Sequence, residues 1–566
     1  MRRMRPLLYA LLKATALTIA LACAACALGG PSIVAISPGR DATNVPTNQT
    51  LRITFDHPMN QSSVGKRFEL RPPVNGCTAG RCLSWNGNTL VFTPSSNLGY
   101  STRYTVVLHG GYAERDGHVN GLDHSWGFTT EGPPALAAVD PADGAVDVAP
   151  DASLVISFNR PMDARSLASA IQLIPETAAR LRPRPGGDGS QFALVPDSVL
   201  QSQTAYEIVI DGARDTHHNL VPGRVETRFV TGSLSLRGRI GYLSGRPQAL
   251  PSAVAVVDPH PDGFLQQLVP RLLYSLPLSD GPQAAILSFD WAPDGRRIVI
   301  SHAGSGSKEG PIRIVDLLSG QARDLRASGS QVVWSPDGAS IIYLSAGRLH
   351  QYRLATNADT TLVTDGALTA PFALSPDGST VAFAVTDGQG LPRLSLINLA
   401  LHTRYHPLGL NDPADRPAWS FDGDRLAFRR LTSSGPELWI YDLSSSGGDA
   451  YRRAAAFDVS SIAWANDNSA LIVASDSGGQ NALYRVSAFA PTEPGGLVKL
   501  TGSTAAPNGM QPATPPYDRR LSFTAVISGQ PQLFLMNADG SRPQQVTRFE
   551  PDFAYTGQGA IWSPSG

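Results

Sequence analysis

Short stretches of alternating apolar and polar residues run through the first part of the chain after residue 31. In Leu51-Arg-Ile-Thr-Phe55 the first, third and fifth side chains point to one side of an extended strand, and the two between them point to the other. This is the pattern of a half-buried strand. Similar segments, separated by Pro, Gly, Asn and Asp, follow over about 100 residues, which predicts a two-sheet β-sandwich.

The same unit occurs a second time, and the first parts of the two copies align without an insertion or deletion. Pro38 and Pro141, Phe55 and Phe158, and Met59 and Met162 mark equivalent positions, each pair 103 residues apart. The opening Pro, the strand end Phe-x-x-Pro-Met and the closing Phe-x-Thr resemble bacterial Ig-like domains of the surface-layer-associated type. The resemblance covers 32–131 and 132–232 and implies two spacer or adhesive modules without catalytic activity.

A different unit repeats from residue 237 to 566. Its core is an aromatic or aliphatic residue followed by Ser-Pro-Asp-Gly or a close variant, and copies follow at intervals of 40 to 50 residues, the period of four-stranded propeller blades. The copies begin at Trp291, Trp334, Leu374, Trp419, Trp464, Thr514 and Trp562. The region resembles the TolB-like (WD40-like) β-propeller, so the whole chain is expected to be all-β.

The repeated residues are expected to be structural. Trp291, Trp334, Trp419, Trp464 and Trp562 are predicted to be buried anchors of the inner strands, and Asp294, Asp337, Asp377 and Asp422 to be turn residues. Pro fixes φ, Asp bonds nearby backbone and Gly accepts a positive φ, so the cassette suits a tight turn. A catalytic site is normally single, whereas this cassette recurs in most units.

The ends of the repeat region predict how the ring closes. The segment 237–280 contains strand patterns but lacks a Trp-bearing strand, and Ala560-Ile-Trp562 supplies one. Joining the two would build one blade from distant parts of the chain and remove an open sheet edge. Seven blades follow from this arrangement. Two alternatives remain: six blades, as is usual in the TolB family, or a truncated chain whose last Trp begins a missing blade.

The N-terminus has the layout of an export signal. Four basic residues precede an apolar run over 14–28 that is too short for a comfortable membrane span. The stretch resembles a bacterial lipoprotein signal, with residues 1–22 removed, Cys23 acylated and 23–31 forming a short tether. Cys26 is the alternative lipidation site, and secretion without a lipid is a further alternative. The resemblance implies an exported protein anchored to the cell membrane or outer membrane.

Composition excludes several classes of function. Without the signal residues, 42 basic and 47 acidic side chains remain, which gives no electrostatic reason to bind nucleic acid. Cys77 and Cys82 are spaced for a disulfide that staples a local loop, and no further Cys or His ligand lies nearby for zinc. No metal and no cofactor are expected.

The sequence contains no recognisable set of catalytic residues. The Gly-x-Ser-x-Gly elbow of a hydrolase is absent. His217 and His218 resemble metal ligands but fall in a predicted turn. Four aspartates lie close together in sequence and could bind calcium, namely Asp140, Asp143, Asp147 and Asp151. The Pro and Gly residues between them favour a turn instead.

Two functions therefore remain. The favoured one is a lipid-anchored binding or scaffold protein of the cell envelope, in which the Ig-like pair presents the propeller to a protein or a glycan. The alternative is a carbohydrate-active lyase or glycosidase with its site in the propeller funnel, which needs carboxylates or histidines converging from different blades. Residue types alone identify no ligand.

Overall fold

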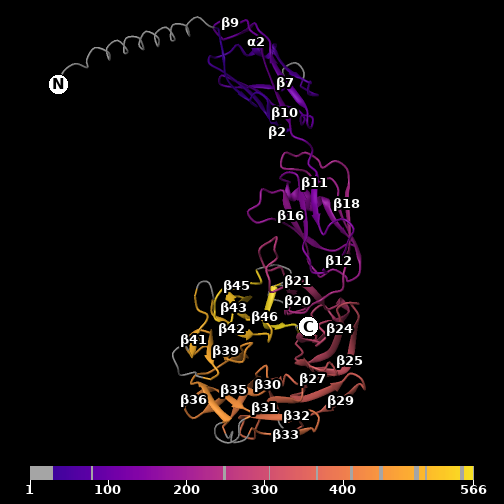
Figure 1. Ribbon diagram of the computed structural model, residues 1–566, viewed down its shortest axis with the longest axis vertical. Coiled ribbons are helices and arrows are strands. Elements are labelled where there is room, and N and C mark those ends of the chain that lie inside the picture. Colours follow the sequence, from indigo (N-terminus) through magenta and orange to yellow (C-terminus); the bar gives the residue numbers. More distant parts are fainter. Residues whose placement is uncertain are drawn as a thin grey trace, which may run out of the picture.

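In the computed structural model the chain is almost entirely β, with two sandwiches in series followed by a propeller (Figure 1). The structure describes residues 30–77, 81–245, 250–304, 306–364, 367–407, 412–444, 450–489, 496–503, 507–548 and 554–564. The expected signal peptide and both lipidation candidates, Cys23 and Cys26, lie outside these residues. No helix in the described ranges has the length and apolarity needed to span a membrane.

The first sandwich consists of the sheets β1-β3-β6-β5 and β2-β10-β7-β4. Their inward side chains, such as Ile53 and Phe55, form one core with Phe128 from the opposite sheet. The disulfide Cys77–Cys82 forms in the segment that joins β4 to β5. The elements are β1 (Ile33–Ser37), β2 (Ala42–Val45), β3 (Leu51–Phe55), α2 (Gln61–Gly65), β4 (Phe68–Arg71), β5 (Leu83–Asn86), β6 (Thr89–Phe92), β7 (Arg103–Leu108), β8 (Tyr112–Ala113), β9 (Val119–Asn120) and β10 (His124–Thr130).

The second sandwich has the same topology, with sheets β11-β13-β16-β15 and β12-β18-β17-β14. Leu154, Ile156 and Phe158 alternate into its core as the sequence pattern predicts. The elements are β11 (Leu136–Asp140), β12 (Ala145–Val148), β13 (Leu154–Phe158), α3 (Ala164–Ala170), β14 (Ile171–Ile174), β15 (Ala179–Pro183), β16 (Gln191–Pro196), β17 (Ala205–Ile210) and β18 (Val225–Thr231).

Seven four-stranded sheets form the propeller within the described residues. Blade 1 is β22 (Ala285–Trp291), β23 (Arg297–Ala303), β24 (Gly310–Asp316) and β25 (Ala322–Gly329), and η1 (Leu278–Asp280) precedes it. Blade 2 is β26 (Val332–Trp334), β27 (Ser340–Ser345), β28 (Arg348–Arg353) and β29 (Ala358–Thr361). Blade 3 is β30 (Leu368–Leu374), β31 (Thr380–Thr386), β32 (Pro392–Asn398) and β33 (Thr403–Tyr405).

The remaining blades continue the ring. Blade 4 is β34 (Ala414–Trp419), β35 (Arg425–Thr432), β36 (Gly435–Asp442) and β37 (Tyr451–Ala455). Blade 5 is β38 (Ser461–Trp464), β39 (Ala470–Ser475), β40 (Ala482–Ser487) and β41 (Leu497–Lys499). Blade 6 is β42 (Gly509–Ala513), β43 (Arg520–Ile527), β44 (Gln530–Asn537) and β45 (Gln544–Gln545). The closing blade is β46 (Ala554–Trp562), β19 (Ile240–Gly245), β20 (Ala253–Val257) and β21 (Arg271–Ser275).

The closing blade joins the two ends of the propeller region. β46 is its inner strand and pairs antiparallel with β19, with Ile240 opposite Trp562 and Tyr242 opposite Ala560. The prediction of an all-β chain with two Ig-like sandwiches and a propeller of seven blades is therefore confirmed, and the alternative of six blades is not what the structure shows. Closure removes the free inner edge that an incomplete ring would expose.

Candidate functional site

The repeated tryptophans brace neighbouring blades. The indole Nε1 of Trp419 donates to the carbonyl of Ala373 at 3.1 Å, and that of Trp464 donates to Ala418 at 2.9 Å. Trp562 bonds Ala513 and Trp291 bonds Ile561 in the same way, both at 3.1 Å. In each pair the accepting carbonyl belongs to the residue just before the anchor residue of the preceding blade. Trp291, Trp334 and Trp464 are buried as predicted, whereas Trp419 and Trp562 are half-buried. Four of the five indoles also tie their inner strand to that of the preceding blade, and the Nε1 of Trp334 makes no such bond.

The repeated aspartates lie in the turns after the inner strands. Asp337 accepts from the hydroxyl of Ser335 at 2.6 Å and from the backbone N–H of Ala339 at 2.9 Å. These bonds, the hydroxyl first, lower the pKa of the Asp337 carboxyl. Asp377 and Asp422 make equivalent bonds, and Asp294 accepts from the N–H of Arg296. All four carboxylates hold backbone turns.

One carboxyl group departs from the pattern of the inner strands. Five other blades have Trp or Leu as the anchor residue, and in each of them the residue just before the anchor is Val, Ala or Ile. In blade 1 the residue at this position is Asp290. Its Oδ1 accepts from the backbone N–H of Trp291 at 2.9 Å, and its Oδ2 accepts from that of Trp334 in blade 2 at 2.7 Å. Asp290 thereby links the inner strands of blades 1 and 2.

A cavity of about 630 Å³ opens beside this carboxyl group. Its walls include the anchor ends of β22 and β34, which belong to blades that are not adjacent, so the cavity lies at the mouth of the central channel. We call it the channel mouth. Its wall is mainly aromatic, aliphatic and proline side chains, and Asp290 is the one carboxyl among its described lining residues. Its most prominent rings and prolines are Trp419, Phe421, Trp562, Pro515, Pro516 and Tyr517.

Burial in the channel mouth raises the pKa of Asp290 to about 7, against the two backbone N–H bonds that favour the charged form. The unfolded chain ionises this group near its ordinary value of 3.8, whereas the folded protein keeps the proton up to about pH 7. The unfolded state therefore binds fewer protons over that interval. The contribution of Asp290 to the free energy of unfolding therefore falls as the pH rises from about 4 to about 7, and it is constant above that range.

We expect Asp290→Asn to remove this pH dependence. The amide loses one acceptor, which costs stability at every pH, but it has no ionisation to suppress. Relative to the wild type, the variant gains on the order of 2 kcal/mol between pH 5 and pH 8. Urea unfolding followed by tryptophan fluorescence at both pH values measures the difference. If the difference in unfolding free energy between variant and wild type were the same at pH 5 and pH 8, the raised pKa of Asp290 would be contradicted.

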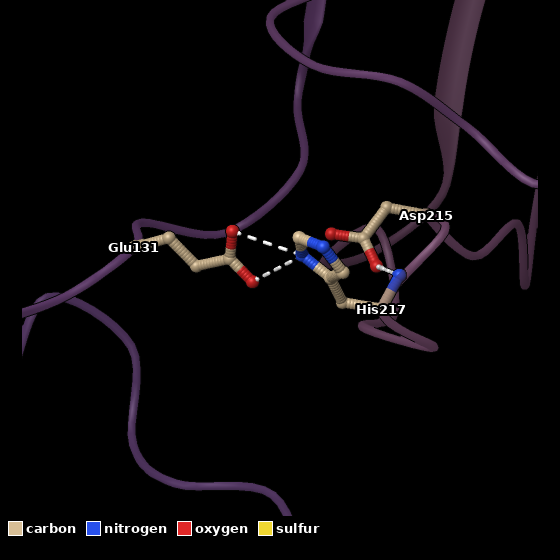
Figure 2. A group of neighbouring side chains, drawn as sticks. All are labelled: Glu131, Asp215 and His217. Atoms are coloured by element: carbon tan, nitrogen blue, oxygen red, sulfur yellow. Dashed lines mark hydrogen bonds and ion pairs between the residues drawn. The ribbon is translucent and has the colours of Figure 1, made fainter. Parts of the chain in front are cut away.

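A second polar cluster joins the two Ig-like domains. Glu131 lies on the connection between them, and Figure 2 shows the ring of His217 pointing at its carboxylate, with Nδ1 at 2.9 and 3.1 Å from the two oxygens. Asn219 donates from Nδ2 to Glu131 and to Asp215, each at 2.9 Å. From the first domain, the backbone N–H of Thr47 also donates to Glu131. We call this cluster the interdomain clamp.

The clamp has the ligand types of a metal site but holds a protein cation. Carboxylate oxygens of Glu131 and Asp215 and a ring nitrogen of His217 lie within 4.8 Å of one another. However, Nη1 of Arg160 lies 2.8 Å from Glu131 and 3.6 Å from Asp215. Asp215 is fully buried and Glu131 is 6% exposed, so the guanidinium neutralises carboxylates that have little water. A metal ion would have to displace this arginine.

The turn predicted around His217 and His218 is present. Asp215 Oδ1 accepts from the backbone N–H groups of His217 and Asn219, and His218 has a φ of 65°. The two imidazoles do not act as a pair, because only His217 contacts Glu131. Two of the four aspartates considered for calcium have separate partners: Asp143 accepts from the N–H of Arg228, and Asp151 pairs with Arg239.

The second Ig-like domain is fixed to the rim of the propeller. Residues just after β16 extend along β21, the outermost strand of the closing blade, where Leu272 exchanges backbone bonds with Asp197 and Val199 at 2.8 and 3.0 Å. Arg271 donates to the carbonyl of Pro196, and Arg239 pairs with Asp151. Figure 1 shows the sandwiches extending from this rim, beside β20 and β21.

Sequence reasoning missed Asp290 and the partners of His217. A blade-by-blade alignment of the residue before each anchor carries the signal for Asp290, because it is the only charged residue at that position. No comparable signal marks Glu131 or Arg160. They are 29 residues apart, and Asp215 is more distant still; only the placement of the two domains brings them together.

Comparison with known proteins identifies the family of the two sandwiches. Residues 29–130 and 131–231 each match the family model of the bacterial Ig-like domain. No curated protein matched the sequence. Similar solved structures include TolB of Agrobacterium tumefaciens, with 19% identity, covering 46% of this chain and 94% of that one at a TM-score of 0.35.

Two further solved structures are similar to this chain at low identity. TolB of Acinetobacter baumannii has 14% identity and covers 76% of this chain and 99% of that one, with a TM-score of 0.36. An oligogalacturonate lyase of Vibrio parahaemolyticus has 12% identity and covers 52% and 85%, with a TM-score of 0.39. The propeller assignment rests on the seven sheets themselves. The chain carries two bacterial Ig-like domains followed by a seven-bladed β-propeller.

Proposed function

We propose that the protein is a binding protein of the cell envelope that uses the channel mouth of its propeller to hold a partner protein. The channel mouth carries the proposal, since an open, mainly apolar cavity of about 630 Å³ is the usual form of a binding site. Every described residue that lines it belongs to the propeller. The Ig-like pair therefore leaves this surface open to a partner.

The interdomain contacts favour a stalk of defined geometry. The interdomain clamp ties the first Ig-like domain to the second, and the strand pairing at β21 ties the second to the rim. A flexible tether would not need buried ion pairs at its joints. The proposed role of the sandwiches is to hold the propeller at a fixed distance and angle from the N-terminus.

The N-terminal sequence supplies the proposed anchor. Acylation of Cys23, or of Cys26 as the alternative, would attach the stalk to a membrane, and two or more acyl chains give stable attachment. The described domains begin at Gly30, so the tether is short and the first sandwich would lie close to the lipid surface.

The chemistry of the channel mouth favours a protein partner over a glycan. Four of the indole N–H groups around the channel are already bonded to carbonyls of neighbouring blades. Few polar groups are left there to match sugar hydroxyls, whereas half-buried rings such as Phe421 suit apolar side chains.

An enzyme in the funnel is the second candidate, and Asp290 is the observation in its favour, since a carboxyl group with a pKa of about 7 suits a general acid. Glycoside chemistry needs a second carboxylate, and the described lining residues contain no other. Both oxygens of Asp290 also bond backbone N–H groups. Its role as a link between blades accounts for it better.

The proposal predicts that Phe421→Ser abolishes partner capture. Truncating a central aromatic anchor commonly costs 2 kcal/mol or more of binding free energy, about 30-fold in affinity. The full chain, purified in detergent, is used to capture partners from envelope extract, and each captured protein is quantified by mass spectrometry. Phe489→Ser, at a ring that is 60% exposed after β40, is the matched control. Equal capture by both variants and the wild type would refute the channel mouth as the binding surface.

A further inference from the structure

A cavity of about 800 Å³ opens at one side of the first sandwich, between the edge strands of its two sheets. β4 supplies one wall, β5 supplies another, and α2 supplies a third. We call it the edge cavity. Its described lining residues all belong to the first sandwich, which lies far from the propeller, so the edge cavity is separate from the channel mouth (Figure 1). Its volume falls within the range of small-molecule sites, about 300–1,000 Å³.

Aromatic rings form much of the wall of the edge cavity. The ring centroids of Phe68 and Phe92 lie 5.3 Å apart, and Trp85 stacks on Phe55 with centroids 6.1 Å apart and planes inclined by 26°. Phe55 is 2% exposed, whereas Trp85 is half-buried and lines the cavity. Since Phe55 covers one face of the indole, the opposite face is the one that a ligand can reach. The negative face of an aromatic ring attracts polarised C–H groups, such as those of a sugar ring.

The second sandwich shows that the fold does not require Trp85. In the first sandwich Trp85 lies one strand away from Ile53 in the paired register. In the second sandwich Pro183 lies one strand away from Ile156 in the same way. Ile53 and Ile156 are equivalent positions of the two copies, 103 residues apart, so Pro183 takes the place of Trp85. The indole is a feature of the first sandwich alone, and its role lies outside what the two copies share.

Polar side chains of α2 and the residue after it are free to bind a ligand. Gln61, Ser62 and Lys66 line the cavity, and their side chains have no hydrogen-bond or ion-pair partner within the described part of the chain. The carboxylate of Glu69, in contrast, is held by Arg71 at 2.7 and 2.8 Å. Hydroxyl and carboxamide groups both donate and accept hydrogen bonds, so they match sugar hydroxyl groups. An acyl chain in the same place would cover these polar groups without bonding them.

We propose that the edge cavity binds a neutral oligosaccharide, with one sugar ring stacked on Trp85 and hydroxyl groups bonded by Gln61 and Ser62. This inference goes beyond the proposed function, because it concerns the first sandwich and leaves the channel mouth to a protein partner. A chain with both sites holds a glycan near its base and a protein at its far end.

Isothermal titration of the full chain, purified in a detergent without a sugar headgroup, tests the proposal. The probes are cellotetraose, N-acetylchitotetraose and maltotetraose, with palmitate as the apolar alternative. At least one oligosaccharide should bind with a Kd of about 1 mM or tighter. The proposal is overturned if none of the three reaches that affinity, or if palmitate binds and no oligosaccharide does.

A size series at one glycine locates the binding. Gly65 lines the cavity, and a Cβ added there would lie 3.6 Å from Leu83, an ordinary contact. Gly65→Ala adds only this methyl group and should weaken the oligosaccharide less than twofold. Gly65→Leu fills part of the cavity and should weaken it at least tenfold. Both substitutions suit a helix better than glycine does, so the fold should persist, which thermal unfolding of each variant checks.

A polar variant tests the contact with the sugar hydroxyl groups. Gln61→Ala removes one proposed hydrogen bond and should weaken the oligosaccharide about fivefold. Gln172→Ala, at an exposed glutamine of the second sandwich, is the matched control and should bind as the wild type does. Wild-type affinity in both Gly65→Leu and Gln61→Ala would show that the oligosaccharide binds elsewhere and would overturn the assignment.

Discussion

A chain that stops at residue 553 will lose the cooperative unfolding of its propeller. The deletion removes β46, so β19 has no inner partner and the ring is open. It also removes the indole brace of Trp562 to Ala513 and the carbonyl of Ile561 that Trp291 needs. Single large-to-small core substitutions cost 3–5 kcal/mol, and losing a whole strand should exceed that. We expect an early, broad unfolding transition and rapid proteolysis between blades.

A point variant separates the effect of ring closure on stability from the effect of shortening the chain. Trp562→Ala keeps β46 but removes its ring and brace, and we expect a loss of about 3–5 kcal/mol from the propeller transition alone. Trp85→Ala, which affects the core of the first sandwich, should leave that transition unchanged. A chain ending at 553 that unfolds at the wild-type midpoint would show that β46 does not close the ring.

Glu131→Ala will uncouple the two Ig-like domains. The carboxylate bonds His217 and Asn219 and forms an ion pair with Arg160, so its loss leaves a buried guanidinium without its main partner. Breaking a buried ion pair costs about 3–5 kcal/mol. We expect unfolding of the second sandwich at lower denaturant, together with a wider spread of interdomain angles in small-angle X-ray scattering.

An exposed glutamate of the same domain provides the control. The Glu226 side chain is 40% exposed and pairs with Arg224, and surface pairs of this kind contribute about 0–1 kcal/mol. Glu226→Ala should therefore scatter as the wild type does. If Glu131→Ala also gave the wild-type scattering profile, the clamp would not set the geometry of the stalk.

The fold was largely predictable because repetition exposes it. The spacing of Phe55 and Phe158 identifies two copies of one sandwich, and the Trp-x-Pro-Asp-Gly period identifies the blades. Even closure follows, since 237–280 lacks a strand that Ala560–Trp562 supplies. Local alternation and turn chemistry determine these features, and both are visible in a single sequence.

The sites were harder to predict because they depend on how domains meet. Arg160 and Glu131 contact only because the second sandwich sits against the end of the first. The arginines that line the cavity between the second sandwich and the propeller come from three separate segments, β15, β21 and residues 544–548, which no spacing connects. Asp290 is intermediate: its difference from the equivalent residues of other blades is visible, but its bond to Trp334 needs the inner strands side by side.

Site-specific photo-crosslinking in the intact envelope shows which surface of the propeller or the stalk touches a partner. A photoreactive phenylalanine derivative is placed singly at Phe421 in the channel mouth, at the exposed Phe489 of blade 5, and at Val146 of the second sandwich, which is 69% exposed. If the channel mouth is the binding surface, position 421 gives one discrete protein adduct and the other two positions give none. Adducts from Phe489 or Val146 with none from Phe421 would contradict it.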